Sequence, residues 1–309
     1  MSAESGSAET AASADPVQVC WRATQADAVG WCIDGDEYFS ALRSALGKAR
    51  REILIVGWDI DSRLELIRDR DHPDHPSPLA ETLQTLAEAT PGLEVRVLAW
   101  DYALVYVLER ELLPARSFGW RRYRRLYFHL DDRHPLGASH HQKLVVIDGS
   151  LAFIGGIDLT RGRWDSRRHA AGDERRLDPD GKPYPPFHDV QAVVSGSLAA
   201  DLRELVGQRW EVATGNALAP LPEGAPGPDL WPDAVTRRAS GADAALARTW
   251  SRVGGGDAVR EIREVYLCLI RSARFSIYIE NQYLSAPDIS EALARRLEAA
   301  EGPAVVIVL

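Results

Sequence analysis

Short apolar, β-branched runs alternate with longer amphipathic segments along most of the chain. The runs predict buried strands, among them 53–56, 93–100 and 144–147. The spacing of apolar residues predicts helices over 38–48, 79–89, 198–210 and 259–272. Strands and helices that alternate in this order predict an α/β fold, an α-β-α sandwich around a mixed sheet.

The same pattern occurs twice. Residues 49–56 align with 273–280, residues 79–83 with 289–293, and residues 92–98 with 302–308. We therefore predict one complete repeat and the start of a second. The predicted boundaries are a disordered tail at 1–16, a first repeat at 17–213, a Pro- and Gly-rich linker at 214–245, and the start of the second repeat at 246–309.

His141 and Lys143 lie two residues apart where the apolar run 144–147 begins. Side chains two apart on a strand face the same side, so an imidazole and an ammonium are expected to project together. An imidazole can act as a nucleophile or as an acid/base near neutral pH, and an ammonium can hold a phosphate oxygen. The pair therefore suits attack on a phosphodiester.

An Asp-Gly dipeptide at 148–149 predicts a hairpin turn after that strand. Asp148 is separated from His141 by roughly 23 Å of extended chain, so we expect it to be a structural carboxylate at the turn. Gly155-Gly156 allows close backbone approach where the second strand of the hairpin returns. Asp158 is then expected to arrive near the imidazole.

Together, His-x-Lys-x-x-x-x-Asp at 141–148 and the Gly-Gly and Asp158 that follow resemble the signature of the phospholipase D superfamily. Further matches are Gly-Trp-Asp-Ile at 57–60, Phe-His-Asp-Val at 187–190, Gln-Arg-Trp at 208–210 and Tyr-Ile-Glu-Asn-Gln-Tyr at 278–283. The resemblance covers residues 17–309. It fits the phospholipase D (transphosphatidylase) branch better than the cardiolipin synthases, whose motif usually continues Gly-Ser-x-Asn.

The resemblance implies a metal-independent, two-step phosphatidyl transfer through a phosphohistidine, with no cofactor. In this scheme His141 is the nucleophile, or the acid that serves the nucleophile, and Lys143 holds a non-bridging phosphate oxygen. Asp158 lies near the phosphate. The signature also counts Asp148 among the catalytic residues, beside the structural role expected from strand length.

Other positions are implied by the resemblance alone. Asp189 matches the carboxylate that orients the motif histidine, although it could instead be a turn residue at the start of a strand. Four residues are candidates for substrate binding: Arg163, His188, Glu280 and Gln282. The last two could instead be polar residues at a sheet edge.

The superfamily's chemistry needs two such motifs, and this sequence contains one. We therefore expect a truncated two-motif enzyme, a phospholipase D-type phosphodiesterase that hydrolyses or transphosphatidylates phospholipid headgroups. The second half-site would come from a missing C-terminal part or from a second copy in a homodimer, so the chain alone is expected to be inactive. Two alternatives remain open: a non-catalytic fragment or binding module, and a homodimeric, nuclease-like phosphodiesterase.

The formal net charge of −9 argues against a nucleic-acid partner. Residues 116–125 interleave arginines with aromatics, which indicates either contact with phospholipid at a bilayer surface or a solvated helix face. Three cysteines without metal spacing favour a reducing compartment and no metal site. The sequence shows neither a signal peptide nor a transmembrane run, so we expect a cytoplasmic protein with peripheral membrane contact.

Overall fold

The structure, a computed structural model, describes residues 15–68, 78–101, 124–135, 137–221, 229–251 and 257–309. These residues form two compact units. The large unit is Thr24–Ala244. The small unit is Ala245–Leu309 together with the described residues that precede Thr24.

The large unit is built on one eight-stranded sheet. Its elements are β1 (Arg22–Ile33), α1 (Asp34–Lys48), β2 (Glu52–Gly57), α2 (Leu79–Ala89), β3 (Glu94–Trp100), β4 (Leu126–Asp131), β5 (Leu144–Ile147), β6 (Leu151–Gly155), β7 (Val190–Ser195), α4 (Ser197–Thr214) and β8 (Ala239–Leu246). The strand order is β4-β3-β2-β5-β6-β7-β1-β8. Strands β2, β3 and β4 run parallel, whereas β5, β6, β7 and β1 pair antiparallel with their neighbours. The predicted α/β fold with a mixed sheet is therefore confirmed.

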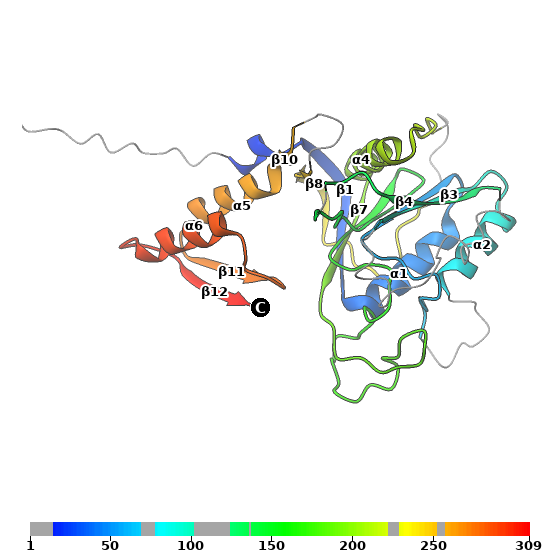
Figure 1. The fold of residues 1–309 in the computed structure, drawn as a ribbon, viewed down its shortest axis with the longest axis horizontal. Helices are drawn as coiled ribbons and strands as arrows, with labels where there is room; N and C mark the ends of the chain where they lie inside the picture. Colours follow the sequence, from blue (N-terminus) through cyan, green and yellow to red (C-terminus); the bar gives the residue numbers. More distant parts are fainter. Residues whose placement is uncertain (1–14, 69–77, 102–123, 136, 222–228, 252–256) are drawn as a thin grey trace, which may run out of the picture. The chain divides into compact units, whose positions relative to one another are not determined.

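Helices cover both faces of this sheet (Figure 1). On one face α1 and α2 join a core that includes Ile53 and Ile55 of β2 and Phe153 of β6. On the other face α4 packs across β2, β4, β5, β6 and β7. Neighbouring residues of a strand point to opposite faces, so the fully buried Leu54 faces α4. Burial on both faces explains why β5 is apolar at every position.

One end of the sheet collects His141, Lys143 and Asp158 of the signature. The parallel strands β2, β3 and β4 finish there, and β5 begins there because it is antiparallel to β2, with Leu144 opposite Val56. β6 ends and β7 begins at the same end, where Gly155 lies opposite Gln191. β1 also finishes there. We call this the site end, and the opposite end, which carries the β5–β6 turn, the turn end.

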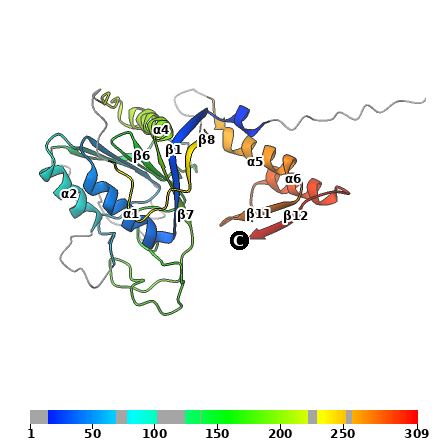
Figure 2. The same cartoon turned by 180° about the vertical axis from the view of Figure 1, so that it is seen from behind.

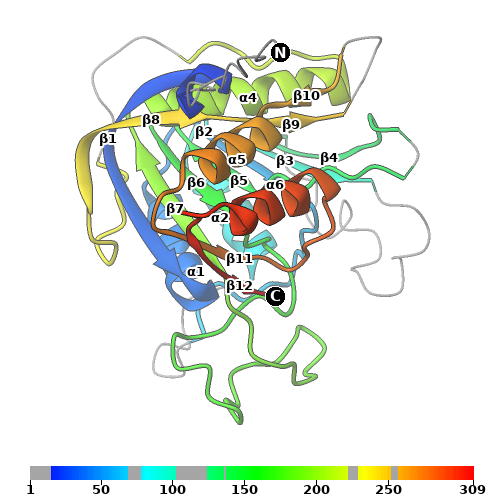
Figure 3. The same ribbon diagram turned by 90° about the vertical axis from the view of Figure 1, so that its left-hand side faces the viewer.

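The small unit contains η1 (Pro16–Val19), β9 (Thr249–Trp250), β10 (Val259–Arg260), α5 (Glu261–Ser272), β11 (Ser276–Glu280), α6 (Pro287–Glu298) and β12 (Ala304–Val308). α5 and α6 pack through Leu267, Ile270 and Leu293 against one face of the parallel β11–β12 pair (Figure 2 and Figure 3). The other face leaves Tyr278 and Val306 exposed.

The strand register supports the predicted internal repeat. Ser276 lies opposite Ala304 in β11–β12, and Glu52 lies opposite Glu94 in β2–β3. These two pairs are equivalent positions of the sequence repeat. The parallel pair of the small unit therefore repeats the register of the large unit, and each pair follows a helix, α5 or α1.

The segment read from the sequence as a linker, 214–245, contributes to the large unit. Leu230, Trp231 and Val235 are buried in its core, and the Trp231 indole N–H donates to the Val235 carbonyl at 2.8 Å. Farther along, β8 pairs at the edge beside β1. Isolated apolar residues between prolines and glycines carry no periodicity, so the sequence pattern does not distinguish them from a linker.

Candidate active site

His141 and Lys143 stand just before β5 at the site end. The Lys143 Nζ lies 2.9 Å from Asp158 Oδ2, and these side chains are 6% and 2% exposed. The same Nζ donates to the His141 carbonyl at 3.1 Å. Asp158 Oδ1 accepts from the backbone N–H of Trp58 at 2.8 Å. The hairpin thus returns Asp158 to the motif, and the carboxylate ties Lys143 to the end of β2.

The His141 ring is exposed and meets the Trp58 ring edge-on, with 6.0 Å between centroids. Although part of His141 is open to solvent, the protein atoms packed around the ring lower the pKa of the imidazole below its ordinary value of 6.5, and the Lys143 charge lowers it further against the opposing charge of Asp158. A lowered pKa keeps the ring neutral at pH 7, so a nitrogen lone pair is available for attack.

Burial also lowers the pKa of the Lys143 ammonium, while the Asp158 carboxylate opposes that effect. A buried ammonium held against one carboxylate is a preorganised positive charge. A phosphate oxygen that approaches this charge meets it in a region of low water content, where the attraction is stronger than in bulk solvent.

Asp189 lies against the glycine pair of the hairpin. A Cβ added to Gly156 would come within 2.3 Å of the Asp189 carboxylate oxygens, so this close approach requires glycine. Burial raises the pKa of Asp189, and the Lys143 charge opposes the rise. In the part of the chain that the structure describes, Asp189 makes no hydrogen bond to the His141 ring; its Oδ1 accepts from the Val190 N–H at 2.7 Å.

His188 belongs to a cluster that the sequence did not reveal. His188 Nδ1 lies 2.7 Å from Asp34 Oδ1, and His169 Nε2 lies 3.2 Å from Asp34 Oδ2. The other His169 nitrogen lies 3.0 Å from Asp165 Oδ2. One ligand atom from each of Asp34, His169 and His188 lies within 4.8 Å of the other two, so these three residues could hold a metal ion.

No spacing signals this cluster, because its members come from distant segments. The signal is conformational: Asp34 and His169 adopt φ values of 65° and 43°, which are unusual outside glycine. Asp34 is fully buried. Arg163, predicted to bind substrate, lies over the Phe187 ring, with its guanidinium carbon 4.9 Å from the ring centroid.

Asp148 lies at the turn end, at the opposite end of β5 from Lys143. Its carboxylate accepts from the backbone N–H groups of Arg50, Arg51 and Glu52 at 2.8 to 2.9 Å. The turn has positive φ at both central residues, 50° at Asp148 and 65° at Gly149. These values are those of a tight hairpin turn. The structural role expected from strand length agrees with these contacts.

Glu280 and Gln282 belong to the small unit. The Tyr278 hydroxyl donates to Glu280 Oε1 at 2.6 Å, and both Glu280 and Gln282 are exposed. Their substrate-binding role stays a prediction.

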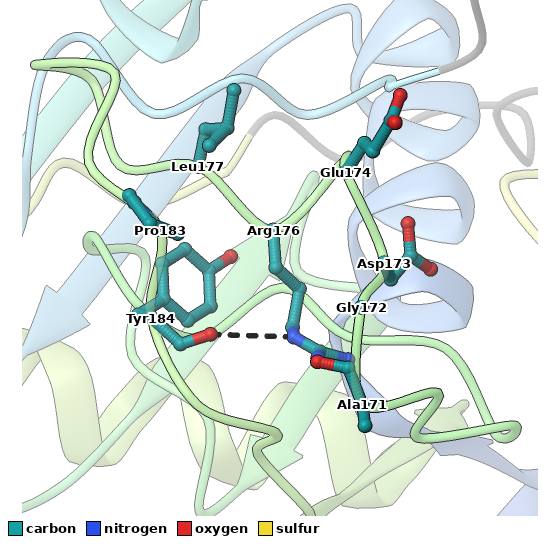
Figure 4. A pocket seen from close by; sticks show the side chains of 8 residues that line it. All are labelled: Ala171, Gly172, Asp173, Glu174, Arg176, Leu177, Pro183 and Tyr184. Carbon is teal, nitrogen blue, oxygen red and sulfur yellow. Dashed lines mark hydrogen bonds between the residues drawn. The ribbon is translucent and has the colours of Figure 1, made fainter.

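The loop between β6 and β7 forms a pocket of about 470 Å³ (Figure 4). Its lining residues are Ala171, Gly172, Asp173, Glu174, Arg176, Leu177, Pro183 and Tyr184. Arg176 is committed to the loop itself, because its guanidinium donates to Asp165 and to the Ala170 and Ala171 carbonyls. None of the residues that line the pocket is a candidate catalytic residue.

The arginine-rich stretch 116–125 lies outside the described residues except for Arg124 and Arg125. Among the helices that the structure describes, none combines the length and apolar character needed to cross a bilayer.

Residues 130–224 match the sequence model of the family "Phospholipase D". Phospholipase D C of Dictyostelium discoideum is 29% identical over 59% of this chain and 12% of its own length. Phospholipase D alpha 1 of Zea mays is 29% identical over 77% of this chain and 38% of its own length. The chain thus spans less than two fifths of the length of either curated relative.

Among solved structures, phosphatidylserine synthase of Haemophilus influenzae superposes with a TM-score of 0.55. The superposition covers 93% of this chain and 62% of the Haemophilus protein, at 13% sequence identity. At that identity the likeness shows the fold alone. The segment matched by the family contains His141, Lys143 and Asp158, which the structure brings together at the site end. The family match and the curated relatives support a place for this chain in the phospholipase D superfamily, and the fold agrees with it.

Proposed function

We propose that this chain supplies one of two catalytic half-sites of a phospholipase D-type phosphodiesterase that acts on phospholipid headgroups. The observation that carries the proposal is the solvent-accessible imidazole of His141 beside the buried Lys143–Asp158 pair. One group offers a lone pair to phosphorus, and the other offers a fixed positive charge to a phosphate oxygen.

In the first step an imidazole nitrogen of His141 forms a bond to phosphorus, and the bond from phosphorus to the headgroup oxygen breaks. Negative charge grows on the non-bridging oxygens, and the Lys143 ammonium stabilises it. The result is a phosphatidyl group on His141 and a free headgroup. In the second step water or an alcohol attacks phosphorus and loses its proton to the partner histidine that protonated the headgroup, the P–N bond breaks, and His141 returns to its free form.

An alkoxide headgroup leaves poorly unless it receives a proton. The second motif histidine would donate that proton, and it would come either from another segment of the enzyme or from a second copy of this chain. Asp189 would orient a motif histidine once substrate closes the site. Arg163 and His188, with Glu280 and Gln282 of the small unit, are the proposed substrate contacts. Contact with the membrane would be peripheral and reversible.

The experiment that tests this proposal is an NMR titration of the chain, labelled with ¹⁵N in its histidine rings, with inorganic phosphate. The His141 signals should shift saturably. Lys143→Met should abolish the shift, whereas Lys182→Met, which removes an exposed lysine of the β6–β7 loop, should preserve it. The monomeric chain should not turn over a short-chain phosphatidylcholine.

Unchanged His141 signals at saturating phosphate would contradict a phosphate site. Sustained turnover by a monomer would contradict the half-site. Cleavage of single-stranded DNA by a dimer, with no action on phospholipid, would favour the nuclease-like alternative instead.

A further inference from the structure

A buried ion pair lies behind the motif, on the α4 side of the sheet. Arg209 of α4 is 1% exposed and donates to Asp131 Oδ2 at the end of β4. Its other terminal nitrogen donates to Gln142 Oε1 at 2.9 Å. One guanidinium therefore joins the edge strand of the sheet to the residue that directly follows His141.

The residue before His141 meets the same carboxylate. His140 Nε2 lies 3.3 Å from Asp131 Oδ2, and the His140 side chain is 8% exposed. The same nitrogen lies 3.2 Å from the Arg133 carbonyl. Both neighbours of His141 are thus held by one pair, Arg209 and Asp131.

This arrangement fixes the direction of His141. In an extended segment successive side chains point to opposite sides. Because His140 and Gln142 are held in the buried network, His141 must point the other way, toward Lys143 and Trp58. Backbone pairing does not join β4 to this segment, since β3 and β2 lie between β4 and β5 in the sheet, so the side-chain network makes that connection.

The pair is expensive if its role is stability alone. Burial lowers the pKa of Arg209 against the opposing Asp131 charge, whereas at Asp131 the contacts with His140 and Arg209 outweigh burial and lower the pKa to about 2, so the desolvation cost falls on Arg209. Well-packed apolar residues often stabilise such a place as well or better than a buried ion pair. Apolar residues cannot hydrogen-bond two separate polar partners, whereas the planar guanidinium group of one arginine can.

We propose that Arg209 and Asp131 are positioning residues for His141: they hold His140 and Gln142 so that the imidazole stays aimed at the phosphate site. This inference rests on the proposed role of His141. Neither residue touches substrate in this account; each acts through the neighbours of the histidine.

A matched control exists on the same helix. Arg203 of α4 donates to both carboxylate oxygens of Glu52 at 2.5 and 3.0 Å, but this pair lies at the turn end. The test compares Arg209→Met with Arg203→Met, and adds Arg209→Lys and Gln142→Ala in case Arg209→Met does not fold. The first readout is the titration midpoint of the His141 ring by NMR, and the second is thermal stability. The charged groups that influence this midpoint, Lys143, Asp158 and Arg163, are unchanged in all four variants.

We expect the His141 midpoint to rise toward the ordinary histidine value in Arg209→Met, because a released ring gains solvent. Arg209→Lys should give a smaller rise, since an ammonium keeps the charge but not the fork, and Gln142→Ala should also give a smaller one. Arg203→Met should lose stability without moving the midpoint. In an assembled, active enzyme, Arg209→Lys should lower kcat by up to about a hundredfold with KM nearly unchanged.

The inference is overturned if Arg209→Lys and Gln142→Ala leave the midpoint where it is, or if Arg203→Met moves it equally. Because the midpoint needs no turnover, this result is independent of whether the proposed reaction occurs. If His141→Ala abolishes turnover while Arg209→Lys behaves like the Arg203 control, the function stands and the positioning role fails.

Discussion

Charged residues of one signature lie at the two ends of β5, and their contacts differ between the ends. At the site end, Lys143 is held against Asp158 beside an exposed His141. At the turn end, Asp148 accepts three backbone N–H groups that precede and begin β2. A motif can therefore join a reactive pair and a folding contact on one short strand, and spacing alone does not tell which is which.

Helix α4 repeats the contrast behind the sheet. Arg209 binds Gln142, which follows His141, and Asp131, which meets His140, whereas Arg203 binds Glu52 at the start of β2. Both arginines lie on the same helix, and each pairs with a carboxylate of the sheet. Only their position relative to the two ends distinguishes a proposed positioning role from a structural one.

The largest effect is expected on stability at the site end. Asp158→Ala leaves the Lys143 ammonium buried without its carboxylate and removes the acceptor of the Trp58 N–H. Breaking one side of a buried pair should cost about 3–5 kcal/mol of unfolding free energy, measured by urea denaturation. A cost of about 1 kcal/mol or less, as for a surface ion pair, would contradict the burial argument.

A loss of similar size is expected in catalysis. Lys143→Met removes the charge that faces the phosphate, so kcat of the assembled enzyme on a short-chain phospholipid should fall by about a hundredfold to a thousandfold. Lys182→Met serves as the control for losing one lysine. Full activity in Lys143→Met would remove Lys143 from the mechanism.

A smaller effect is expected at the turn end. Asp148→Ala removes the acceptor of three N–H groups at a partly exposed turn. The unfolding free energy should drop by about 2 kcal/mol, comparable to the loss of a strong helix cap. The His141 ring signals of the folded protein should stay in place; a large change in them would link the two ends of β5 more closely than we expect.

The smallest effect is a pH shift at the site end. The folded-state pKa of His141 lies below its ordinary value of 6.5, so as the pH falls the imidazole is protonated in the unfolded chain before it is protonated in the folded one. Stability from this group is therefore complete above pH 6.5 and declines as pH falls from 6.5 toward the folded-state pKa. Lys143→Met removes the positive charge that helps to lower the His141 pKa. The titration midpoint of the His141 ring, measured by NMR, should therefore rise by a fraction of a pH unit. A downward move would contradict the assigned cause.

Much of the fold follows from local pattern. The β5–β6 hairpin was predictable because Asp-Gly at 148–149 joins two apolar runs, and the return of Asp158 to the motif followed from strand length. The parallel pair of the small unit was predictable because its sequence repeats that of β2 and β3.

The rest depends on contacts between distant segments. Asp34 and His188 meet because β1 ends beside the start of β7, and the β6–β7 loop adds His169; no spacing in the sequence records this. In the sequence, Arg209 is one of two arginines in an amphipathic helix. Its role becomes visible only in the fold, where the order of the strands places Asp131 and Gln142 within hydrogen-bond distance of it. Trp231 joins the core from a Pro- and Gly-rich stretch without any apolar period around it.

The central claim, that His141 is the nucleophile of a phosphate half-site, is tested most directly by mass spectrometry after exposure to bis(4-nitrophenyl) phosphate. Nitrophenolate leaves without a proton, so the first step needs no partner histidine. We predict one equivalent of nitrophenolate released and one aryl phosphate attached to His141, stable in alkali and lost in acid, and absent from His141→Ala. An adduct that persists in His141→Ala, or no adduct in the folded wild-type chain, would contradict the claim.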